Sequence, residues 1–182
     1  IGVKVDVTTH FGCTSNSTCG CKKEREQLSS IQAVCIGVIT IDTIALVDKY
    51  PTADERVIAE EISRAGGGPA AVAAVTLSRL GVRSAVVGTI GDDADGKEVL
   101  RIFENEGVDT SGISIGTTAT AGSVIVASKE FSARSISTRQ PVSQAVMNDA
   151  AKKLIASADW VHVDHVGIKR LVEADISRGK GP

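Results

Sequence analysis

The chain has 182 residues, of which 42% are hydrophobic and 23% charged, close to the averages of globular domains. It carries 20 Lys and Arg residues against 22 Asp and Glu, a formal charge of −2, and only 3% of its residues are aromatic. These values exclude a disordered tail or a collagen. They also argue against a nucleic-acid partner held through phosphate contacts or stacked bases.

The first 30 residues differ from the rest, because a polar stretch at 14–18 and a charged stretch at 22–26 show no apolar period. We expect a poorly ordered extension over residues 1–30. No apolar run reaches the roughly 18–20 residues of a membrane span, and no secretory signal is visible. We therefore expect a cytoplasmic protein without a membrane partner.

Three cysteines in the extension, Cys13, Cys19 and Cys21, lie close together, with His10 nearby as a fourth candidate ligand. Zinc sites of the usual kind need paired cysteines two to four residues apart. This spacing does not match, so we expect ordinary reduced thiols and no metal.

From Ile31 onward, apolar strands alternate with helical patterns. The nearly continuous β-branched run at 33–41 predicts a strand buried on both faces, and residues 56–64 predict a more exposed strand. Residues 69–80 predict a helix, with Pro69 in its first turn and Gly81 just beyond its end. Another buried strand is expected at 83–90.

The second half continues the alternation. Asp95, with Glu98 three residues later, predicts a capped helix that stops before Gly107. Strands at 122–128 and 134–138 would form a hairpin. Ser143 would cap a helix to about residue 156, followed by a strand at 160–164 and a helix from Ile168. Alternating strands and helices predict a layered α/β fold, with Met147 and Trp160 in its core.

A glycine run, Gly66, Gly67 and Gly68, stands between an expected strand and the helix that begins at Pro69. Glycines let a ligand approach the backbone, and a helix start offers free N–H groups. A tight turn without a ligand is the alternative. The run, extended to Ala71, also fits the loose Gly-x-Gly-x-x-Ala fingerprint of dinucleotide-binding proteins.

Residues 91–98 nearly match a phosphate-binding P-loop, but Glu98 replaces the hydroxyl that would hold magnesium. Three aspartates in the stretch would repel phosphate, which favours a capped acidic turn. Asp42, at the end of the first buried strand, would lie at the sheet edge where ligands gather. There it is either a clamp for sugar hydroxyls or a turn cap. His162 is expected to be a structural strand residue, and His165 is a slightly better candidate.

Taken in order, these features resemble the ribokinase-like (pfkB) family of carbohydrate and nucleoside kinases. The matching pieces are Gly37-x4-Asp42, the glycine-rich helix start at 66–71, Gly-Asp-Asp-x-x-Gly at 91–96 and Glu-Gly-Val-Asp at 106–109. The resemblance extends over residues 33 to about 178. The helix start is also similar to the sulfofructose kinase-like branch of the family.

The resemblance implies a Rossmann-like three-layer α/β/α domain over residues 31–182, with a small β lid from segments at about 46–64 and 122–138. It implies transfer of the ATP γ-phosphoryl group, with Mg²⁺, to a hydroxymethyl group of a sugar or related alcohol. By position, Asp42 would hold substrate hydroxyls, the sugar would lie against Gly66, Gly67 and Gly68, and Arg134 on the lid hairpin would contact it. Lid strands that pair between subunits would make a homodimer.

Two departures from the family pattern bear on function. Val72 stands where the family often has an Asn that touches substrate. The signature Asp-Thr-x-Gly-Ala-Gly-Asp, which in the family supplies the catalytic base and an anion hole, does not occur in the chain. The resemblance therefore assigns no catalytic residue here, leaves the nucleotide-binding residues unknown, and implies that the C-terminal ATP-binding part is missing.

Three hypotheses remain open at this point. The chain is the sugar-binding and lid part of a carbohydrate kinase, inactive by itself. Alternatively, it is a truncated homologue that binds a sugar without catalysis. The third hypothesis, an NAD-dependent oxidoreductase, depends on the glycine fingerprint alone.

Overall fold

The structure, a computed structural model, describes residues 30–139 and 146–174. The chain divides into two units, residues 1–30 and residues 31–182. Every element below belongs to the second unit. The expected N-terminal extension with its three cysteines, the Ser143 cap and the end of the last helix lie outside the described residues.

The main sheet has four parallel strands in the order β5-β4-β1-β8. Their bounds are Ala33–Ile36 for β1, Ser84–Gly91 for β4, Ile113–Gly116 for β5 and Trp160–Val163 for β8. The two central strands, β1 and β4, are almost entirely buried. This explains their continuous apolar sequence, since a parallel sheet is covered on both faces.

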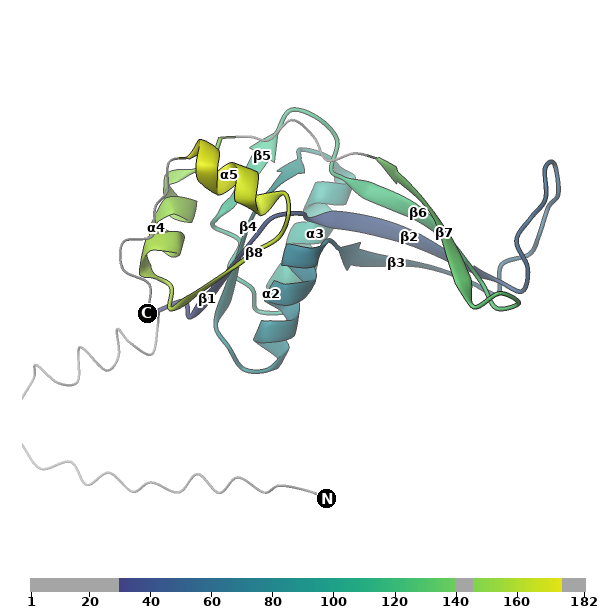
Figure 1. The fold of residues 1–182 in the computed structure, drawn as a ribbon, viewed down its shortest axis with the longest axis horizontal. Helices are drawn as coiled ribbons and strands as arrows, with labels where there is room; N and C mark the ends of the chain where they lie inside the picture. Colours follow the sequence, from purple (N-terminus) through teal and green to yellow (C-terminus); the bar gives the residue numbers. More distant parts are fainter. Residues whose placement is uncertain (1–29, 140–145, 175–182) are drawn as a thin grey trace, which may run out of the picture. The chain divides into compact units, whose positions relative to one another are not determined.

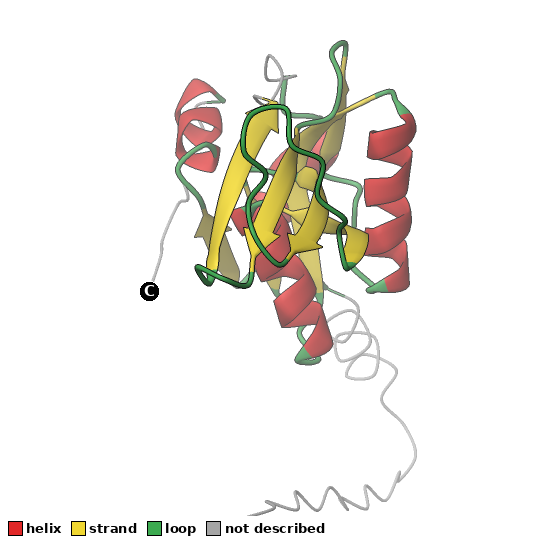
Figure 2. Cartoon of the chain, turned by 90° about the vertical axis from the view of Figure 1, so that its right-hand side faces the viewer, coloured by secondary structure: helices red, strands yellow, loops and turns green. Residues whose placement is uncertain are grey.

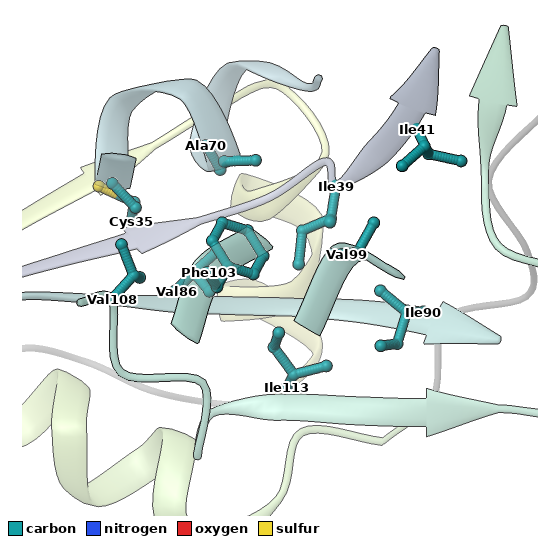
Figure 3. Packing of buried hydrophobic residues seen from close by; sticks show 12 residues of the cluster. Cys35, Ile39, Ile41, Ala70, Val86, Ile90, Val99, Phe103, Val108 and Ile113 are labelled. Carbon is teal, nitrogen blue, oxygen red and sulfur yellow. The ribbon is translucent and has the colours of Figure 1, made fainter. Parts of the chain in front are cut away.

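Helices cover both faces of this sheet, as Figure 2 shows. On one face lie α2 (Pro69–Arg79) and α3 (Ala94–Asn105), and on the other α4 (Asp149–Ser157) and α5 (Gly167–Glu173). Alternate residues of each strand serve the two sides: Cys35 and Val86 pack with Phe103 of α3 (Figure 3), whereas Val34 and Val87 pack with residues of α4. The expected α/β/α layering is confirmed.

A second sheet extends to one side of the core (Figure 1). It has the strand order β3-β2-β6-β7, in which β2 and β6 are parallel and both outer pairs are antiparallel. The bounds are Thr40–Val47 for β2, Glu61–Gly67 for β3, Gly122–Ser128 for β6 and Ala133–Arg139 for β7. We call this sheet the lid sheet. It starts earlier and ends later than the expected segments at 46–64 and 122–138.

Several sequence expectations differ from the structure. The single strand at 33–41 is two strands, because the chain leaves the main sheet after Ile36 and enters the lid sheet at Thr40. The exposed strand at 56–64 begins only at Glu61. The short strand β5 had no sequence signal. Met147 is buried as expected, but Trp160 is 71% exposed, because β8 lies at the edge of the described sheet.

Two helix caps also differ. Asp93, and not Asp95, is the N-cap of α3, and its side chain accepts a hydrogen bond from the N–H of Gly96. Asn148 caps α4 in the same way through Ala151. Among residues 30–139 and 146–174, no helix combines the length and the apolar character that a membrane crossing requires.

Candidate sugar-binding site

Asp42 lies in the lid sheet, on the third residue of β2. The expectation that it ends a strand of the main sheet is wrong. The apolar pattern continues through Ile39 and Ile41 because both residues pack into the core next to α2 and α3. Asp42 points to the opposite face of β2, since successive side chains of a strand alternate.

One carboxylate oxygen of Asp42, Oδ1, is buried and has no hydrogen-bond partner. A buried acceptor without a donor costs free energy, so such atoms need an explanation. A ligand hydroxyl is a suitable donor. This unpartnered oxygen is the main observation in favour of a sugar site at Asp42.

Gly67 lies directly beside this carboxylate, and Gly68 follows it at the junction of β3 and α2. A Cβ atom on Gly67 would be 2.3 Å from Oδ2 of Asp42 and 2.6 Å from Oγ1 of Thr40, so any other residue here would have to displace these side chains. Gly68 has a φ of 96°, which favours glycine, and it is the N-cap of α2. A Cβ atom on Gly66 would lie on the opposite face of β3, near Ile102 of α3. The structure thus brings Asp42 together with Gly67, whereas Gly68 packs against the backbone of Val38.

Two hydroxyl residues that sequence reasoning missed continue the site across the lid sheet. Ser123 of β6 is paired with Asp42, and Thr138 of β7 is paired with Ser123. Their hydroxyl oxygens are 3.3 Å apart. Because residues in register share a face, all three side chains form one polar row. Only the parallel pairing of β2 with β6 reveals this row, and no local sequence signal encodes that pairing.

Arg134 is on the same face but farther out. It pairs with Ala127, four residues along β6 from Ser123, so it lies about 13 Å along the strand at roughly 3.3 Å per residue. Its side chain is exposed. The structure does not bring Arg134 next to Asp42, and a substrate contact by Arg134 stays a prediction.

The acidic turn at 91–96 anchors the lid sheet to α3. Asp93 accepts hydrogen bonds from the backbone N–H of Thr120 at 2.8 Å and from its hydroxyl at 2.6 Å, just before β6 begins. Burial raises the pKa of Asp93, but the Thr120 hydroxyl, two backbone N–H groups and the Arg139 charge together hold it below its ordinary value. This confirms the capped acidic turn, with Asp93 as its acid.

Val72, the departure from the family's Asn, is 53% exposed on α2. It lines a separate cavity of about 290 Å³ between α2 and α3, together with Val75 and Ile102. His162 and His165 are exposed, and Asp164 is buried. The described residues contain no cluster of three or more His, Cys, Asp or Glu that could hold a metal ion.

The dinucleotide interpretation of the glycine run is wrong. Its fingerprint requires a strand of a parallel βαβ unit before the glycines. Here the glycines follow β3, which is an outer strand of the lid sheet and is antiparallel to β2. The run therefore serves the lid sheet and the start of α2.

Comparison with known proteins agrees with this arrangement. The profile of the pfkB family carbohydrate kinases matches residues 30–177. An ATP-dependent ribose-1-phosphate kinase of Halopiger xanaduensis is 33% identical over 85 residues, which is 47% of this chain and 29% of that protein.

Two solved structures are similar in fold. A ribokinase of Cryptococcus neoformans in complex with ADP has a TM-score of 0.52 at 25% identity, over 60% of this chain and 35% of that one. An Arabidopsis thaliana ribokinase complexed with ribose and ATP has a TM-score of 0.62 at 21% identity, over 75% of this chain and 46% of that one. The chain thus spans less than half the length of these relatives.

The profile match covers most of the chain, and it includes the lid sheet, the glycine run and the acidic turn. The similar ribokinase structures have the same α/β fold. The chain belongs to the pfkB family of carbohydrate kinases.

Proposed function

We propose that this chain is the sugar-binding and lid part of a kinase that transfers the ATP γ-phosphoryl group to a hydroxymethyl group of a sugar or related alcohol. The unpartnered Oδ1 of Asp42 carries the proposal. Asp42 would accept hydrogen bonds from substrate hydroxyls, and the backbone at Gly67 would admit the sugar ring. Ser123 and Thr138 would add neutral donors and acceptors along the same row.

The lid sheet would contribute by covering the sugar. Phosphoryl transfer depends mainly on positioning and charge stabilisation, and water in the site would compete for the phosphoryl group. A four-stranded sheet that carries Asp42 on one face can both orient the sugar and exclude water. Selection within the family, including the sulfofructose kinase-like branch, stays a prediction.

We propose ATP binding only for a complete kinase of this family, and not for this chain by itself. The family signature Asp-Thr-x-Gly-Ala-Gly-Asp, with its catalytic base, is not present in the 182 residues. We therefore assign no residue of this chain to ATP or to the Mg²⁺ that would accompany it, and we expect no phosphorylation by this chain alone. A non-catalytic sugar-binding protein uses the same site and remains the second candidate.

The lid sheet is also the proposed surface for pairing of two copies. Three of its large apolar side chains are exposed: Ile62 at 70% and Val124 at 57% on one face, and Ile136 at 49% on the other. Exposed apolar groups of this kind are typical of association surfaces. Cytoplasmic localisation stays a prediction.

Calorimetry with a panel of ketoses, aldoses and nucleosides tests the sugar site. Asp42→Ala is expected to weaken binding at least roughly tenfold, since a hydrogen bond to a charged group contributes about 1.5–3 kcal/mol. Gly67→Ala is expected to have a similar effect, because its Cβ displaces the Asp42 carboxylate. Asp48→Ala, which removes an exposed carboxylate just beyond β2, is the matched control. Binding that is indifferent to Asp42 and Gly67 would overturn the site.

A further inference from the structure

Asp95, in the first turn of α3, holds arginines from both outer strands of the lid sheet. Arg64 of β3 donates through Nη2 to Oδ1 of Asp95, and Arg139 of β7 donates through Nη2 to Oδ2 at 3.0 Å. The strand order is β3-β2-β6-β7, so these arginines come from the two opposite edges of the sheet. A single carboxylate of the core thus joins both edges of the lid sheet.

The segment that leads into the inner strand β6 is also hydrogen-bonded close to Asp95, through Thr120. Arg139 also donates through Nε to the carbonyl of Thr120 at 3.0 Å, and the hydroxyl of Thr120 accepts the N–H of Gly91 at 2.9 Å. Thr120 is fully buried, two residues before β6 begins. The two outer lid strands and the segment that leads into β6 therefore meet the start of α3 through hydrogen bonds or ion pairs.

This network lies on the face of the lid sheet opposite Asp42. Arg64 pairs with Thr43, whereas Asp42 pairs with Ala65, so Asp42 and Arg64 project from opposite faces of adjacent strands. On this face, Asp95, Thr43, Ser137 and both arginines line a hollow of about 180 Å³. A change in the angle between the lid sheet and α3 would therefore move Asp42 and Ser123 relative to the core.

We propose that Asp95 is a positioning residue that, through Arg64 and Arg139, holds the lid sheet at the angle where Asp42 can engage substrate. The expected effect of Asp95 on sugar binding rests on the proposed sugar site, whereas its effect on the lid sheet does not depend on that site. Both arginine side chains are about half exposed, at 50% and 52%, and that of Asp95 is 27% exposed. Partly exposed ion pairs are individually weak, so we expect a modest effect from the loss of this contact.

Hydrogen exchange of the 182-residue protein tests the inference. Asp95→Asn keeps the size of the side chain but removes its charge, and we expect amides of β2, β3, β6 and β7 to exchange roughly fivefold faster. Amides of β1 and β4 should keep their wild-type rates, which separates a loosened lid from a general loss of stability. Raising the salt concentration should accelerate lid exchange more in the wild type than in Asp95→Asn, because the Lys129–Glu60 pair is screened in both proteins.

Asp149→Asn is the matched control, because Asp149 lies in the first turn of α4 and pairs only with Lys152 in the described contacts. It should leave lid exchange unchanged. Sugar affinity should fall in Asp95→Asn and recover in part in Asp95→Glu. If lid exchange in Asp95→Asn equals that of wild type, the inference is wrong whether or not sugar binds. Faster lid exchange in a protein that binds no sugar would support the positioning contact and contradict the proposed function.

Discussion

Cys35 lies in the middle of β1 with no exposed surface. Burial raises the pKa of its thiol from 9.0 to about 11. Since the folded pKa is the higher one, stability is fully retained below pH 9 and falls as the pH rises from 9 toward 11, where only the unfolded chain ionises. Lone buried thiols of this kind are unreactive, which agrees with a structural role for Cys35.

Urea unfolding at pH 8 and pH 10.5 measures this effect. Wild type should lose about 2 kcal/mol more stability between the two pH values than Cys35→Ala, since one pKa unit corresponds to about 1.4 kcal/mol. The Cys35→Ala variant supplies the baseline for every group other than this thiol. Equal losses in the two proteins would contradict a protected thiol.

At the scale of elements, Asp164 links three of them: β1, β8 and α5. It follows β8 and is buried; its Oδ2 accepts the N–H of Val38 at 2.7 Å, and its Oδ1 accepts those of Val166 and Gly167 at 2.9 Å. The carboxylate thus connects the end of β1 with β8 and supports the start of α5, which has only seven residues.

Asp164→Ala should therefore destabilise the protein by about 3 kcal/mol or more, because three N–H groups lose their acceptor. Asp109→Ala is the control, because within the described part of the chain that carboxylate accepts only the N–H of Ser111, at an exposed turn. It should cost less than about 1 kcal/mol in the same thermal or urea unfolding experiment. A similar cost for the two substitutions would show that Asp164 does not connect these elements.

Element type was largely predictable from local pattern. The helix at 69–79, the strand at 84–91 and the hairpin of β6 and β7 follow from apolar periodicity, Pro69 and Gly81. The passage from one sheet to the other near Val38 was not predictable, because Ile39 and Ile41 are as apolar as β1. Hydrophobic periodicity reports burial, and both sheets are buried where they meet.

The site was predictable only in part for the same reason. Asp42 and the glycine run carry signals in the sequence, and the structure places Asp42 beside Gly67. Ser123, Thr138 and the two arginines at Asp95 carry none, because their positions depend on pairing between strands far apart in the chain. Residue type can suggest a ligand, whereas strand register decides which residues reach it.

At the scale of the whole molecule, β8 forms an apolar edge of the main sheet. It pairs with β1 on one side, and no other described strand pairs with it. Trp160 is exposed there, beside a hollow of about 720 Å³ lined mainly by apolar side chains, among them Ala73, Leu77 and Val82. An apolar sheet edge of this kind is typically covered in a folded protein. More than half of each similar ribokinase chain has no counterpart in this one.

Trp160 is the only tryptophan, so its fluorescence reports on this edge. In the 182-residue chain we expect the emission of a solvent-exposed indole and strong quenching by acrylamide. In a polypeptide that also carries an ATP-binding half, the emission should shift to the blue and quenching should fall, because apolar contacts replace water around the ring. A Trp160→Phe, Phe131→Trp variant is the control, since Phe131 is exposed at the turn between β6 and β7. Its emission should be the same in both polypeptides. If Trp160 is equally quenched in both polypeptides, the added part does not cover β8.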